Sequence, residues 1–434
     1  MALRTSVATV LAVALVALAG CSGPLAGDAA TPTEPSSSTA TETSTATRTS
    51  ADATTSTPTA TDTPTATRTP VQSPTDGAGS GVGESERVVV NNGTLSVNAT
   101  TVYRRVERLL GADAPAPTVE VTERPAVNLS GGSVRSERRA LGFRAGPGSI
   151  GECGDIYPAN AGADEVRVTV GDRSPREVEL VLVHEFVHVL QYNDSDYDEL
   201  SNQTDYTLGH ALGEGAAVYA AQTYGERYGA SYDGKTPVEL RRCLYERVGD
   251  ADREWIGQYY FGARYYQQRV DSPADFSTVY RSPPRTTEQL IHGLEPGAEP
   301  PATLSVAVES SGDWRAERRE QKGELALRTW LRVGLDGERV DTAASGWGND
   351  TFVRFERNGT DSVAWAIRTD SAADANELEA AVTDLATVLR DRNATTVRQV
   401  RASDRTLVVF AGQKTFVSNA TASGTDGDVT LTVP

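Results

Sequence analysis

The sequence predicts an α+β protein with two folded parts. Three observations support this class. Residues 84–300 begin with short β-branched runs and continue into long apolar helical patterns. A Pro/Gly-rich stretch, GLEPGAEPPA at 293–302, interrupts the pattern. Residues 301–434 then alternate strand-like runs around one helical segment, which predicts a smaller α+β domain.

The N-terminal sequence predicts an export segment. Arg4 precedes an apolar run from Val7 to Ala19 that is too short to span a membrane comfortably, so residues 1–20 are interpreted as a signal peptide. The run ends in Leu-Ala-Gly-Cys, which resembles the lipobox of prokaryotic lipoproteins, and Cys21 would then carry the lipid. The alternative is an uncleaved anchor helix. In either case the body is expected to lie outside the membrane, and we predict an extracellular protein attached to the cytoplasmic membrane only through its N-terminus.

The amino-acid composition predicts an unfolded stalk before the folded parts. After Cys21, residues up to 83 are almost wholly Thr, Ala, Ser, Pro, Asp and Gly and have too few large apolar side chains to fold. The net charge of −18, with three lysines among 41 basic residues, resembles that of proteins from salt-loving archaea. It also argues against nucleic acid as a partner, because the phosphate backbone would be repelled.

Two further cysteines remain in the exported body. Cys153 and Cys243 are predicted to form a disulfide, the alternative being two separate buried thiols. Nine Asn-x-Ser/Thr sequons are consistent with a glycoprotein, among them Asn98, Asn128, Asn202, Asn349, Asn393 and Asn419.

Local patterns predict several elements. The runs at 88–90 and 95–97 flank Asn-Asn-Gly and predict a hairpin, and Asn98 is placed to cap a helix that Gly111 ends. Strands are predicted near 117–121 and 164–170, and helices at 206–228, in pieces over 237–270 and near 371–390. Strands are also expected at FVRFE, VAWAIRT and TLVVFAG.

The most specific chemical signal is His-Glu-Phe-Val-His at 184–188. Ser174, Pro175 and Glu177 form a capping-box pattern, so the motif is predicted to lie on a buried helix that ends near 193–194. Histidines four residues apart share one helix face and can bind one metal ion. Zn²⁺ suits imidazole ligands and leaves a position for water, from which Glu185 would take a proton.

The next predicted helix supplies Glu214, in EGAAVY, 26 residues after His188. HEFVH followed by this glutamate resembles the gluzincin clan of zinc metallopeptidases over residues 164–228. The resemblance implies a zincin-like fold for residues 84–300, with His184, His188 and Glu214 as ligands and Glu185 as the catalytic base. His210, one turn before Glu214, is the alternative third ligand or a neighbour of the ligands.

The resemblance also raises a role for His292, because gluzincin-type sites often place a histidine or tyrosine beside the developing oxyanion; the alternative is a surface histidine. A wider resemblance, through PRTTEQLIH and GWGNDTFVRFE, is to secreted surface proteins of haloarchaea. We therefore expect an extracellular zinc metallopeptidase acting on peptides or proteins. The alternative is an inactive peptidase-like surface binding protein, but Glu185 favours catalysis, because a structural zinc site gains nothing from a base.

Overall fold

The protein has a mixed α+β fold. The structure, a computed structural model, describes residues 87–126, 134–146 and 148–434. The predicted signal peptide at 1–20, the predicted lipidation site Cys21, the predicted stalk up to residue 83 and the sequon at Asn128 lie outside these residues. Within them, no helix combines the length and apolar character needed to cross a bilayer.

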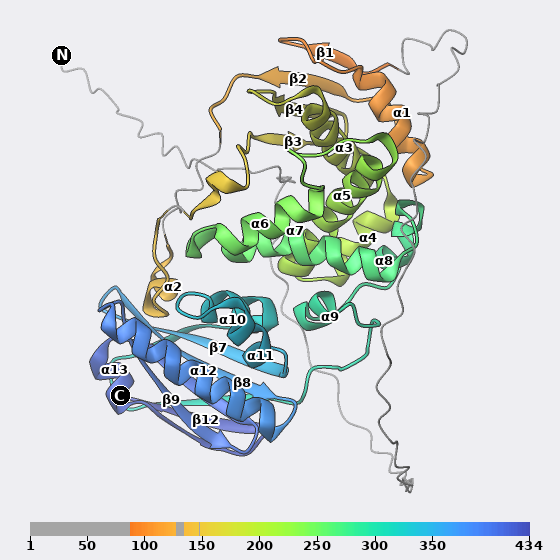
Figure 1. Cartoon of the computed structure of the whole chain (residues 1–434). Helices are drawn as coiled ribbons and strands as arrows, with labels where there is room; N and C mark the ends of the chain where they lie inside the picture. Colours follow the sequence, from red (N-terminus) through yellow and green to blue (C-terminus); the bar gives the residue numbers. More distant parts are fainter. Residues whose placement is uncertain (1–86, 127–133, 147) are drawn as a thin grey trace, which may run out of the picture. The chain divides into compact units, whose positions relative to one another are not determined.

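The first sheet has four strands in the order β1-β2-β4-β3. Its first three strands are parallel, and β3 pairs antiparallel with β4 at the edge. Helices and strands of this half follow in chain order (Figure 1): β1 Val89–Asn91, α1 Ala99–Leu110, β2 Thr118–Thr122, α2 Ser136–Ala140, η2 Ile150–Glu152, β3 Ala159–Ala161, β4 Glu165–Thr169, α3 Pro175–Tyr192, α4 Ser195–Gln203, α5 Tyr206–Tyr228, α6 Pro237–Arg247, α7 Asp250–Arg269, η3 Pro273–Asp275, α8 Phe276–Arg281 and α9 Thr287–His292.

The expected hairpin at 88–97 is wrong. Residues 95–97 form no strand, and β1 instead pairs in parallel with β2, with Val90 opposite Val119. A parallel partner must come from a distant part of the chain, and here α1 forms the crossover. The local Asn-Asn-Gly signal was therefore overridden by packing between segments that are far apart in sequence.

The helix predictions are confirmed. The side chain of Asn98 accepts a hydrogen bond from the backbone N–H of Thr101 at 3.0 Å, and Gly111 ends α1 in the left-handed region at φ 63°. The strands expected near 117–121 and 164–170 correspond to β2 and β4. α5 covers 206–228, and the region 237–270 divides into α6 and α7.

The C-terminal half contains two sheets, with orders β6-β7-β8-β10-β9 and β11-β12-β5. Its elements are β5 Ser305–Ser310, β6 Arg315–Glu320, α10 Gly323–Leu331, α11 Gly337–Ala344, β7 Trp347–Arg357, β8 Thr360–Thr369, α12 Ala372–Asp391, β9 Thr396–Ser403, β10 Thr406–Gly412, α13 Lys414–Asn419, β11 Thr421–Gly424 and β12 Asp428–Val433. The expected strands in β7, β8 and β10 and the expected helix at α12 are confirmed.

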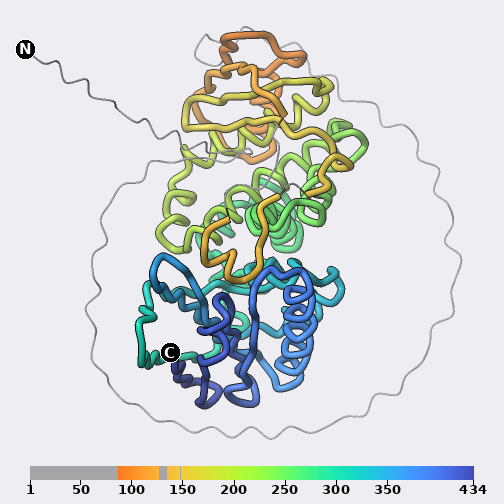
Figure 2. Tube along the Cα trace, turned by 90° about the vertical axis from the view of Figure 1, so that its left-hand side faces the viewer, coloured from red at the N-terminus to blue at the C-terminus, as the bar shows by residue number. Residues whose placement is uncertain are grey.

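The five-stranded sheet is covered on both faces, which explains its continuous apolar runs. In β8, Val363, Trp365 and Ile367 belong to the core that includes α10, α11 and α12. The alternate residues Ala364 and Ala366 pack in a second core with α13 and the three-stranded sheet. The helix α12 lies along one face of the larger sheet (Figure 1, Figure 2).

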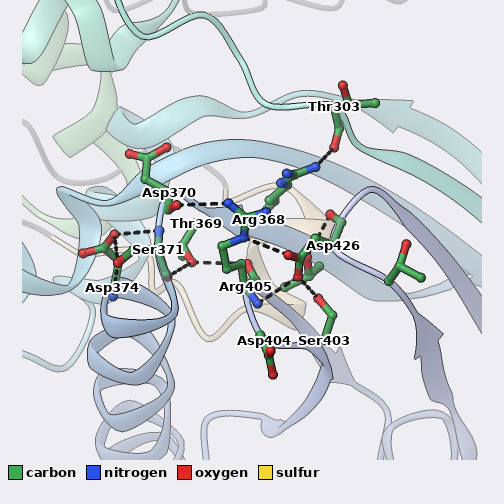
Figure 3. A network of polar contacts seen from close by, with 12 residues as sticks. Thr303, Arg368, Thr369, Asp370, Ser371, Asp374, Ser403, Asp404, Arg405 and Asp426 are labelled. Carbon is green, nitrogen blue, oxygen red and sulfur yellow. Dashed lines mark hydrogen bonds and ion pairs between the residues drawn. The ribbon is translucent and has the colours of Figure 1, made fainter. Parts of the chain in front are cut away.

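A polar network joins the two C-terminal sheets (Figure 3). The carboxylate of Asp426 accepts hydrogen bonds from the hydroxyl of Ser403 at 2.6 Å and from the backbone N–H and Nε of Arg405 at 3.0 and 2.7 Å. These donors lower the pKa of Asp426 to about 2. The ionised carboxylate therefore ties the turn before β12 to the β9–β10 connection.

Candidate metal centre

The helix α3 carries the central residues. Its start is fixed by a capping box, in which the Ser174 hydroxyl accepts from the backbone N–H of Glu177 and the Glu177 carboxylate accepts from the backbone N–H of Ser174. The helix is buried from Val178 to Gln191, so both histidines lie inside the protein. One turn separates His184 from His188, and their rings meet edge to face at 4.8 Å.

The helix α5 carries the third residue, Glu214, and packs against α7 at very close range. A Cβ on Gly215 would lie 2.3 Å from the backbone carbon of Gly262, and a Cβ on Gly262 would lie 2.0 Å from the carbonyl oxygen of Ala211. Only glycine permits this approach of the two backbones. The glycine of the EGAAVY motif therefore fixes the position of the helix beside Glu214.

Three ligand atoms converge between the two helices. Nε2 of His184 lies 3.1 Å from Oε2 of Glu214, Nε2 of His188 lies 3.3 Å from the same oxygen, and the two nitrogens are 3.2 Å apart. His184, His188 and Glu214 are 4%, 2% and 2% exposed. In the described part of the chain, this is the one group of histidine, cysteine and acidic side chains whose geometry can hold a metal ion.

The electrostatics of the group match the needs of a cation. Burial lowers the pKa of His184 to about 4, so the imidazole is neutral at ordinary pH. Burial alone would raise the pKa of Glu214, but the neighbouring His188 and His184 outweigh it and hold that pKa well below its usual range. Neutral imidazoles and an ionised carboxylate are the forms that bind a divalent metal.

Glu185 lies beside this group and is fully buried. Neither of its carboxylate oxygens has a hydrogen-bond partner among the described residues. Burial raises its pKa to about 8. It lines a cavity of about 40 Å³ that is also bordered by His184. An unpartnered buried carboxylate next to a metal-binding group is costly for folding, which points to a role in chemistry.

His210 lies next to the group without joining it. Its Nε2 is 3.6 Å from Oε1 of Glu214, the carboxylate oxygen that faces away from the other two histidines. Its ring stacks on Tyr206 at 5.6 Å and packs edge to face with Tyr259, whose ring stacks on His184 at 6.3 Å. The structure therefore brings Glu214 to the two histidines of α3 and places His210 behind it.

The remaining predicted residues lie elsewhere. Nε2 of His292 is 3.1 Å from both carboxylate oxygens of Glu324 on α10, and His292 does not border the cavity at Glu185. Its bond to Glu324 raises the pKa of His292. This placement gives no support to the oxyanion role. Cys153 and Cys243 form a disulfide that joins the segment after η2 to α6.

Sequence reasoning missed several residues around the group. Arg173 and Arg241 border the cavity at Glu185 together with Tyr232. Arg173 follows β4, Tyr232 lies in the loop between α5 and α6, and Arg241 lies on α6. No sequence motif links these three residues to HEFVH. Only the tertiary structure brings them to the same cavity.

The comparisons with known proteins add one match. Residues 312–431 match a family described as a domain of unknown function, DUF8575. No curated protein and no solved structure matches the chain. The match covers most of the C-terminal half and leaves the metal-binding group outside it.

Proposed function

We propose that the protein is an extracellular, lipid-anchored zinc peptidase of the gluzincin type, which hydrolyses peptide bonds in peptides or proteins. One observation carries this proposal. Two histidines and a glutamate converge from α3 and α5, and an unpartnered glutamate lies directly beside them. The anchor at Cys21 is part of the proposal and rests on the sequence alone.

The donor set and its spacing fit zinc. Tetrahedral coordination with bonds of about 2.0–2.1 Å places neighbouring ligand atoms about 3.3 Å apart. The three atoms of His184, His188 and Glu214 lie 3.1 to 3.3 Å apart, without rearrangement of any side chain. Three protein ligands on one side of a zinc ion leave a coordination position for a reactant, as in catalytic sites.

Each protein group has a task in hydrolysis. A zinc ion held there would act as a Lewis acid that polarises the scissile carbonyl and makes water a stronger nucleophile. In its ionised form, which the charge of a bound zinc ion would favour, Glu185 takes a proton from the attacking water through a carboxylate oxygen that no other group occupies, and later delivers it to the leaving amine. Gln191 bonds to Nδ1 of His188 and directs its Nε2 toward Glu214.

The surrounding fold supports the same assignment. The sheet that packs on α3 is mostly parallel and ends in the antiparallel strand β3, and α3 contacts both β3 and β4. α5 then packs against α3 and supplies Glu214. This arrangement of a small sheet over two helices agrees with the zincin-like fold that the resemblance implies.

A second candidate is a surface binding protein in which zinc only stabilises the fold. The burial of the three ligand residues, none more than 4% exposed, favours it, because a catalytic metal must meet substrate. Glu185 favours the peptidase, since a structural zinc site does not need a buried carboxylate without a partner.

The test compares metal content and cleavage. We expect purified protein to hold about one zinc per chain and to cleave members of a broad peptide library. Glu185→Ala should keep the zinc and lose cleavage, whereas Glu199→Ala, an exposed glutamate on α4, should change neither. Zinc without cleavage would favour the binding protein, and protein that cannot bind zinc would exclude both.

A further inference from the structure

The cavity beside Glu185 is small and reaches the surface. Its volume is about 40 Å³, and its border includes the exposed residue Asp155. One water-sized group needs about 10–15 Å³ of such space, so the cavity has room for about three heavy atoms. It therefore suits a compact polar group and is too small for an aromatic or long aliphatic side chain.

Arg173 is held rigidly at this cavity. Its two terminal nitrogens donate to the backbone carbonyls of Thr169 and Tyr157 at 2.6 and 3.0 Å, and its guanidinium lies 5.1 Å from the centre of the Tyr157 ring. A guanidinium has five N–H donors, so these two bonds leave others free. The residue carries a positive charge whose position is set by the backbone.

Arg241 approaches from α6. Its guanidinium lies over the ring of Tyr259 at 4.6 Å, and that ring stacks in turn on the ligand His184. The same ring is therefore a neighbour of both Arg241 and the ligand His184, and these two residues border one cavity. The disulfide between Cys153 and Cys243 joins α6 to the segment that carries Asp155 and Tyr157, which holds the two sides of the cavity together.

Neither arginine forms an ion pair with a carboxylate in the parts of the chain that the structure describes. Asp155, Glu177 and Glu185 border the same cavity, and the charges of both arginines act on Glu185. Glu177 is engaged in the capping box, and both oxygens of Glu185 lack partners. Two partly buried guanidinium groups with unused donors, in a cavity of this size, form a site for an anion with paired oxygens.

We propose that this cavity is a carboxylate-binding subsite, with Arg241 and Arg173 as its specificity-determining residues, so that the substrate is a peptide with a carboxylate next to the scissile bond. The inference rests on the proposed peptidase function. The carboxylate is either the C-terminus of the substrate or the side chain of an acidic residue. A planar carboxylate matches the fork of donors on a guanidinium and would take the N–H donors that no side chain of the cavity occupies.

The test measures binding with four acetylated tripeptides. Acetyl-trialanine is used with a free carboxylate and as the amide, and acetyl-Ala-Ala-Glu amide is compared with acetyl-Ala-Ala-Gln amide. Dissociation constants are measured by calorimetry on zinc-loaded Glu185→Gln protein, which prevents turnover, at one salt concentration throughout. A parallel series with the wild-type protein measures cleavage.

We expect at least one carboxylate peptide to bind about 10- to 100-fold more tightly than its neutral counterpart. Arg241→Gln in the same background should reduce this difference, because only Arg173 then remains at the cavity, and should leave the binding of the neutral peptides unchanged. Arg241→Lys should restore part of it by restoring the charge. Arg242→Gln, an exposed neighbour on α6 outside the cavity border, serves as the matched control and should have no effect.

The outcomes separate the two proposals. Preference for the free C-terminus assigns the subsite to the C-terminal carboxylate of the substrate, and preference for the glutamate peptide assigns it to an acidic side chain. Equal affinities for all four peptides, or a preference that Arg241→Gln does not reduce, would overturn the subsite even if the wild-type protein cleaves peptides. A preference that depends on Arg241, without cleavage of any peptide, would support the subsite and overturn the peptidase.

Discussion

Nδ1 of His188 lies 2.7 Å from the side-chain oxygen of Gln191, less than one turn further along α3. The amide nitrogen of Gln191 donates to the carbonyl oxygen of Gly213 on α5 and to the hydroxyl of Tyr280 on α8, each at 3.0 Å. These two bonds fix the orientation of the amide, so its oxygen faces His188. His188 must then carry its proton on Nδ1, which leaves the lone pair of Nε2 for a metal.

Gln191→Ala should therefore weaken zinc binding about 10- to 100-fold, because the imidazole loses the bond that sets its tautomer and orientation. Competition with a chelating dye measures the affinity. Tyr280→Phe removes one bond to the amide and keeps the bond to Gly213, so its effect should be smaller. An unchanged affinity in Gln191→Ala would show that the helix alone orients the ligand.

The third ligand can be identified by two substitutions on α5. Glu214→Gln should release zinc, because the carboxylate oxygen that faces both histidines is lost. His210→Gln should keep about one zinc per chain, since His210 lies 3.6 Å from the other oxygen of Glu214. Metal analysis after dialysis gives the answer, and release of zinc by His210→Gln alone would reverse the assignment.

Removal of the disulfide should reduce stability. Cys153 and Cys243 are separated by 90 residues, and the cross-link restricts a long loop in the unfolded chain. The variant with serine at both positions should lose about 4 kcal/mol of the free energy of unfolding in the chain-entropy model. Urea denaturation measures the loss, and the wild-type protein in reductant should match the variant. A loss under about 1 kcal/mol would contradict this entropic account.

Gly215→Ala should disturb the metal centre through the backbone. The added methyl group would lie 2.3 Å from the backbone of Gly262, so α5 and α7 must separate beside Glu214. We expect a loss of about 3 kcal/mol in stability and weaker zinc binding. Gly209→Ala, earlier on α5, meets only the hydroxyl of Thr204 within 3.0 Å and should be tolerated better. Equal stability of both variants would argue against close helix packing here.

The raised pKa of the buried Glu288 predicts that the stability of the protein depends on pH. Glu288 is 2% exposed, and burial raises its pKa to about 9, with further contributions from Asp370, Glu324 and Glu299. The unfolded carboxyl ionises near pH 4.5 while the folded one stays protonated. This residue's contribution to stability is therefore full below about pH 4.5 and is lost progressively as the pH rises toward 9.

The substitution Glu288→Gln should remove that dependence. The amide cannot ionise, so the variant should be more stable than the wild type at pH 8 by about 4–5 kcal/mol, with little difference at pH 4. Urea denaturation across this range is the measurement. Parallel pH profiles of the two proteins would show that Glu288 does not titrate in this window.

The local part of the metal centre could be predicted from residues that are close together in the chain. The capping box of Ser174 and Glu177 and the spacing of His184 and His188 act within a few residues along α3, so they could be read before any contact was known. The same holds for Asn98 and Gly111 at the ends of α1. Glu214 could be predicted because it lies on the next apolar helix, within the EGAAVY sequence that resembles the gluzincin pattern.

The remaining features depend on contacts between distant segments, which leave no periodic signal in the chain. In the folded protein, β1 pairs with β2 although the Asn-Asn-Gly turn pattern predicted a hairpin, and the side chain of His292 bonds to Glu324. The tertiary structure also brings Arg173 and Arg241 to one cavity beside the HEFVH helix. Helix geometry thus fixed which residues can hold the metal, whereas packing between α3, α5 and α6 decided which charges surround it.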